Sequence, residues 1–106
     1  MWAYSTRHPT LSVDFVLPEQ VIPLAHWCKH ARLRSWVKGL YGAKGGACFG
    51  FMPMRLDLED LAALEREVVA VFDRHREADL AFIAAARRAI RASRFVVFDA
   101  WASPPA

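Results

Sequence analysis

Cysteine is scarce in this chain, and long apolar runs are missing. The two cysteines, Cys28 and Cys48, cannot build a disulfide framework, so we expect them to be small buried hydrophobic residues. No apolar run approaches the roughly 18 residues that a membrane-spanning helix needs. The first ten residues also lack the apolar stretch of a secretory signal. These absences predict a cytoplasmic protein without a membrane partner.

Complete catalytic and cofactor motifs are also missing. The glycine-rich segment 41–47 lacks the Gly-Lys-Ser/Thr ending of a phosphate-binding loop, and no Ser or Cys has a neighbouring His and acid in a known local pattern. His26 and His30 would reach one metal ion from a helix, but two ligands are too few. The sequence therefore predicts no enzyme, no metal and no cofactor, and a metal-dependent enzyme is the weakest alternative.

The composition that is present favours one folded domain. Apolar residues make up 55% of the 106 residues and charged residues 24%, which is enough apolar surface for a core. We expect a single α+β domain over residues 1–102 and a disordered tail over residues 103–106.

Three segments are typical of strands. Residues 11–17 alternate apolar and polar side chains, which predicts a half-buried strand. Residues 48–54 predict a second strand, and Pro53 restricts it to an edge or an end. Residues 95–98 are consecutive and apolar, as in a central strand buried on both faces. We expect a short three-stranded antiparallel sheet with residues 95–98 in the middle.

Three segments predict helices that pack on this sheet. Pro23 suits the first turn of a helix over residues 23–38, which Gly39 would end. Asp57 is a helix cap for residues 58–74, and Leu56 and Leu61 are placed to pack around it. An apolar stripe recurs at helical spacing over residues 77–93.

Charge is divided unevenly along the chain. The net charge is +5 over residues 1–56 and −2 over residues 57–106. The basic residues include a group that no acid interrupts, and the acids gather at the start of the second predicted helix. Solvated helix surface explains both groups, and so does contact with a charged partner.

The basic segment 26–36 also contains Trp27 and Trp36. Cations interleaved with tryptophan favour phosphate contact and base stacking. The same residue types dominate the hot spots of protein interfaces. Packing of both tryptophans in the core is a third interpretation, and the sequence leaves all three open.

Four stretches together resemble a family of small, mostly uncharacterised phage and prophage proteins. They cover residues 26–36, 49–65, 79–90 and 95–101, and the most distinctive is the spacing Trp-x-Lys-His-x-x-Leu-x-x-Trp that begins at Trp27. Family members often end the last strand with a Trp pair, whereas here Ala102 follows Trp101. The small single domain is also similar to anti-CRISPR inhibitors of type I systems, which is an analogy of gene class.

The resemblance implies a phage-derived inhibitor that binds a bacterial defence complex, the Cas proteins of a type I CRISPR-Cas system, in the cytoplasm of the host cell. A nucleic-acid-binding phage or prophage accessory protein is the alternative. For the inhibitor we expect binding through the basic residues and one tryptophan of the first predicted helix, or else through an acidic face that mimics nucleic acid. The first set is Lys29, Arg32, Arg34, Trp36 and Lys38, and the second is Glu59, Asp60, Glu65 and Glu67.

Overall fold

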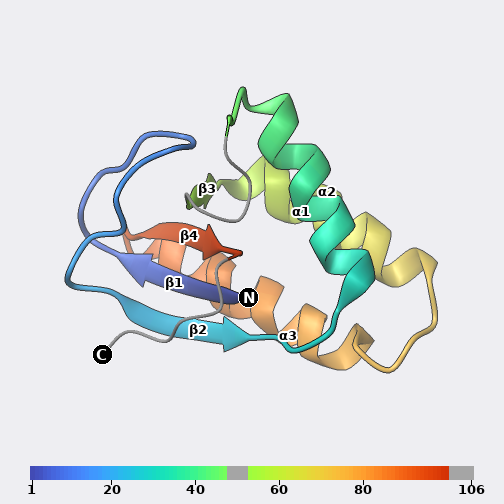
Figure 1. Cartoon of the computed structure of the whole chain (residues 1–106). Coiled ribbons are helices and arrows are strands. Elements are labelled where there is room, and N and C mark those ends of the chain that lie inside the picture. The colour runs from blue at the N-terminus through green and yellow to red at the C-terminus, as the bar shows by residue number, and fades with distance from the viewer. Residues whose placement is uncertain (48–52, 101–106) are drawn as a thin grey trace.

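The computed structural model describes residues 1–47 and 53–100, which form a four-stranded antiparallel sheet and three helices (Figure 1). The strand order is β2-β1-β4-β3. The predicted α+β class and the three helices are confirmed, and the sheet has one strand more than predicted. In chain order the elements are β1 (Trp2–Thr6), β2 (Ile22–His26), α1 (Ala31–Ala43), β3 (Met54–Leu56), α2 (Leu58–Ala70), α3 (Arg76–Arg91) and β4 (Phe95–Asp99).

β4 lies in the interior of the sheet, as its apolar run predicts. It pairs with β1 on one side and with β3 on the other, and its Val96 and Val97 have no exposed surface. The partner of β4 on the first side is β1, however, and not residues 11–17. Residues 48–52 of the predicted edge strand and residues 101–106 lie outside the described part of the chain.

The strand predicted over residues 11–17 is wrong. Only Val13 pairs, in an isolated bridge to Met54. Asp14 then takes a left-handed conformation with φ of 57°, and residues 15–17 after it pair with no strand. The apolar side chains of this segment do not share one buried face, since Phe15 is buried while Leu11 is exposed. The segment is a loop that lies along the outer edge of β3 and touches it at Val13.

The helix predicted over residues 23–38 is wrong in its first half. Pro23 belongs to β2, an edge strand, where a missing N–H is tolerated. Ala3 faces Ala25 while Tyr4 faces Pro23, so Leu24 is the extra residue of a β-bulge. The helix begins only at Ala31 and continues through Gly39 to Ala43.

The second and third helices match their predictions closely. α2 begins at Leu58 as predicted and ends at Ala70, four residues before the predicted end. α3 runs from Arg76 to Arg91, against a prediction of 77–93. In the described part of the chain no helix is long and apolar enough to cross a bilayer.

The core lies between the sheet and the helices. α3 runs behind the sheet in Figure 1, whereas α1 and α2 stand to one side of it. Each helix contributes an apolar stripe to a common cluster with β1, β3 and β4. Its most deeply buried large side chains include Val37 from α1, Leu61 from α2, Ile83 from α3, Met54 from β3 and Phe98 from β4.

Candidate functional site

A buried carboxylate, Asp79, joins α3 to the segment that leads from β2 into α1. It lies in the first turn of α3, on the same stripe as the core residues Phe82 and Ile83, and only 2% of its surface is exposed. Trp27 Nε1 donates to Asp79 Oδ1 over 3.0 Å, and His30 Nε2 lies 2.7 Å from Asp79 Oδ2. The buried charge is thus hydrogen-bonded on both oxygens, as burial of a carboxylate requires.

The hydrogen bonds of His30 define its tautomer. The Leu33 amide donates to His30 Nδ1 over 3.3 Å, so Nδ1 carries the lone pair and caps the start of α1. The ring proton is therefore on Nε2 and is donated to Asp79. Because both nitrogens are engaged, the imidazole has none left to take a proton from a substrate. The His30–Asp79 pair fixes α1 to α3 and has the arrangement of a structural pair.

A hollow of about 290 Å³ lies beside this pair, between α1 and α2. Its walls are apolar and its rim is polar. His30 and Asp79 lie at the α3 side, the walls come from Leu33, Trp36, Leu64 and Val68, and the rim comes from Arg32, Ser35 and Glu67. We call this feature the α1–α2 hollow.

Of the residues predicted to form a basic binding site, Arg32 and Trp36 are partly buried. The Arg32 guanidinium lies 2.5 Å from the Asp73 carboxylate. An amide hydrogen bond from His75 and the charge of Arg32 lower the pKa of Asp73. Trp36 packs against the core cluster. Both residues line the α1–α2 hollow. The charge of Arg32 is already balanced by the carboxylate of Asp73.

The other three predicted basic residues are exposed. Lys29 precedes α1 in a left-handed conformation with φ of 55°. Arg34 and Lys38 lie one turn apart on α1, and both are exposed. We call Lys29, Arg34 and Lys38 the basic face.

The predicted acidic site is divided by contacts within the chain. Asp60 closes the capping box of α2 and pairs with Lys44 over 2.6 Å. Glu65 accepts from Arg87 over 2.9 Å, and this hydrogen bond lowers the pKa of Glu65. Glu59 and Glu67 are the two exposed members of the set, so the four carboxylates do not form one free acidic face.

The histidines that the sequence placed on one helix lie in different elements. His26 ends β2 while His30 caps α1, so the helical spacing that suggested a shared metal does not exist. Over residues 1–47 and 53–100, no group of three or more His, Cys, Asp or Glu side chains is arranged to hold a metal ion. Cys28 is exposed, against the expectation of a buried thiol, and its Sγ lies 4.0 Å from His26 Nε2.

Two residues that define these surfaces, Asp79 and Phe72, were not predicted from the sequence. Asp79 is the one acid that falls in register with the apolar stripe of α3, and that register is the signal that identifies it. Phe72 falls inside the helix predicted over residues 58–74. It lies instead beyond the end of α2 and is 92% exposed.

Comparisons with known proteins give no relative: no family model, no curated protein and no solved structure matches the chain.

Proposed function

We propose that the protein is a non-catalytic binding protein whose basic face contacts an acidic surface of a partner protein. The observation that carries the proposal is the exposure of Lys29, Arg34 and Lys38 along one segment. Lys29 and Lys38 form no ion pair among the described residues, whereas Asp60 and Glu65 of the acidic set are used in pairs within the chain. The sequence resemblance to phage proteins gives the partner: an acidic surface of a bacterial type I CRISPR-Cas complex, which the protein would inhibit by occupying it.

A protein partner is favoured over nucleic acid by the position of the tryptophans. The cations of the basic face suit phosphates as well as carboxylates. Sequence-tolerant binding of single strands, however, also needs exposed aromatic rings. Trp27 is buried and bonded to Asp79, and Trp36 packs toward the core. Trp27 is therefore withdrawn from the surface, and Trp36 is partly buried in the wall of the α1–α2 hollow and not part of the basic face.

Charge reversal tests the proposal. We expect Arg34→Glu with Lys38→Glu to weaken capture by a reconstituted type I complex at least tenfold, because like charges would then face each other. Glu59→Lys with Glu67→Lys is the matched control, since it reverses two exposed charges of α2, and it should retain capture. The measurement is surface-based binding with and without target DNA, on variants checked for folding by circular dichroism.

Two outcomes would contradict the proposal. If the α2 variant loses capture and the α1 variant keeps it, the acidic side makes the contact. If the protein alone binds single-stranded or duplex DNA with an affinity that falls steeply with salt, the partner is nucleic acid, because such a slope reports the number of phosphates contacted.

A further inference from the structure

The end of α2 and the connection that follows it expose three apolar side chains. Phe72 is 92% exposed, and Val69 and Val71 are 48% and 41% exposed. The Arg76 guanidinium lies 5.0 Å from the centre of the Phe72 ring and stacks over it. We call Val69, Val71 and Phe72 the apolar tip. A contiguous apolar cluster with an aromatic ring this exposed is a common mark of an interaction surface.

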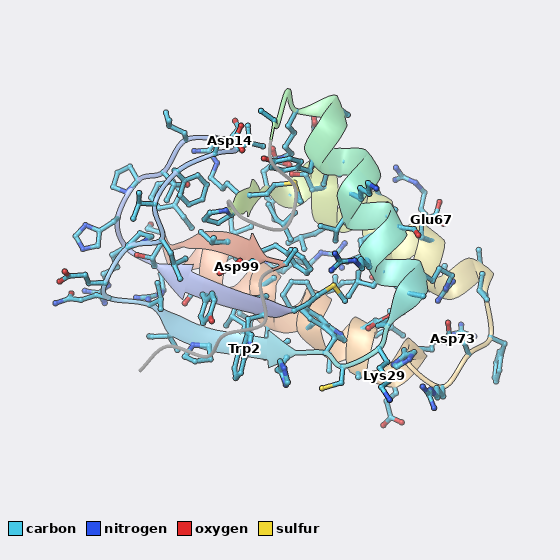
Figure 2. All side chains as sticks on the ribbon, viewed as in Figure 1. Trp2, Asp14, Lys29, Glu67, Asp73 and Asp99 are labelled. Atoms are coloured by element: carbon cyan, nitrogen blue, oxygen red, sulfur yellow. The ribbon has the colours of Figure 1, made fainter. Side chains whose placement is uncertain are left out.

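The apolar tip lies next to the α1–α2 hollow. Glu67 and Val68 line the hollow and directly precede the tip in the chain. Asp73, which follows Phe72, pairs with Arg32 on the rim of the hollow. Figure 2 shows Glu67 and Asp73 at the same end of the molecule. A projecting ring and a recess are thus neighbours on one surface.

The hollow has the size and the lining that a phenyl ring needs. Its volume is about 290 Å³, whereas an apolar protein cavity of about 150 Å³ already accepts benzene. Its walls are Leu33, Trp36, Leu64 and Val68. Phe72 of the same chain does not fill it, since that ring is almost fully exposed.

The charges next to the apolar tip are opposite to the charge on the rim of the α1–α2 hollow. The rim of the hollow carries Glu67, whose carboxylate has no ion-pair partner among the described residues. Arg74 and Arg76 follow the tip in the chain, and Arg76 stacks on its Phe72 ring. The cation on the rim, Arg32, is already paired with Asp73. A tip entering a hollow would therefore bring arginines toward a free acid.

We propose that two copies of the protein form a two-fold symmetric dimer in which Phe72 of each copy enters the α1–α2 hollow of the other. One surface that carries both a projection and a matching recess is self-complementary, and a two-fold axis closes such a contact after two copies. The dimer goes beyond the proposed function, because its contact is made by the apolar tip and the α1–α2 hollow. Lys29, Arg34 and Lys38 are not part of that contact.

Sedimentation from about 1 μM to about 1 mM tests the dimer, because this range spans weak to moderate affinities. The wild-type mass should rise from 12.0 kDa toward twice that value. Phe72→Ser should remain monomeric throughout. Leu11→Ser, which removes an apolar side chain that is 69% exposed in another loop, is the matched control and should dimerise like the wild type. A wild-type protein that stays monomeric at about 1 mM, or a Phe72→Ser protein that still dimerises, would overturn the proposal.

A second variant distinguishes a tip in a hollow from two tips in contact. Ser35 lies exposed on the rim, so Ser35→Trp should fill the hollow without disturbing the core. This variant should be monomeric alone, yet a mixture with Phe72→Ser should form a heterodimer, because one intact tip then meets one intact hollow. Dimerisation of Ser35→Trp to the wild-type extent would show that the hollow is not occupied and would refute the proposal.

Discussion

At the scale of single residues, Asp79 determines how the helices meet. Its two oxygens accept from an indole that precedes α1 and from the imidazole that caps α1. The carboxylate is buried in the core, where a polar group without a hydrogen-bond partner lowers the free energy of unfolding. His75 adds a second imidazole, stacked on His30 with 3.9 Å between the ring centres. The junction of α1 and α3 therefore depends on hydrogen bonds to one acid as well as on apolar packing.

Asp79→Asn should lower the free energy of unfolding by about 1–3 kcal/mol, because the amide presents one acceptor to two buried N–H donors. The alternative tautomer of His30 does not help, since it would direct a second N–H at the Leu33 amide. Urea denaturation at neutral pH measures the loss. Glu77→Gln is the control, because Glu77 is exposed in the same turn of α3. Equal midpoints for both variants would show that the Asp79 network contributes nothing.

At the scale of elements, α2 is defined by its own sequence. Asp57 accepts from the Asp60 amide, and the Asp60 side chain accepts from the Asp57 amide. We expect Asp57→Ala to lower the free energy of unfolding by about 0.5–2 kcal/mol through loss of this cap. Denaturant unfolding of the two proteins at pH 7 is the measurement, and an unchanged midpoint would contradict a capping role.

The loss on Asp57→Ala should also depend on pH. Burial alone would raise the pKa of Asp57, but amide hydrogen bonds from Asp60 and Glu59 and the charge of Lys44 outweigh it and lower the pKa below 3.8. A carboxyl whose pKa is lower in the folded state stabilises the fold above its unfolded pKa and loses that effect as the pH falls. The gap between wild type and Asp57→Ala should therefore be full at pH 7 and narrow below about pH 4.

The elements that were predicted correctly are those with local signals. The cap at Asp57 and the apolar stripe of α3 involve residues within a few positions of each other. β1 and β2 were missed because their stability comes from pairing with each other and with β4, which the local pattern does not report. Pro23 was assigned to a helix because proline suits a first turn and an edge strand equally.

The candidate site was predictable only in part for the same reason. The exposure of Lys29 and Lys38 agrees with their charge, which sequence reports directly. The pairing of Arg32 with Asp73 and of Glu65 with Arg87 joins residues 41 and 22 positions apart. Such pairs depend on how the helices pack, so a charge pattern along the chain does not show which charges remain free.

At the scale of the whole molecule, β4 is the strand on which the fold depends. We expect the amides of Val96 and Val97 to exchange with solvent most slowly, because both residues are fully buried between β1 and β3 and open only when the sheet comes apart. Hydrogen exchange followed by NMR measures this, with Gln20 in the exposed loop after β1 as the internal reference. Exchange at Val96 as fast as at Gln20 would mean that the sheet does not open as one unit.

The pairing of β1 with β4 also has a consequence during translation. Thr6 pairs with Phe95, roughly 90 positions later in the chain. Ribosomes add about 5–20 residues per second. β4 is therefore synthesised on the order of 5–20 s after β1, and β1 lacks this partner during that time. The hairpin with β2 protects one edge of β1 during this time, and the other edge stays open to pairing with foreign strands. We therefore expect chaperone demand to persist until β4 has left the ribosome.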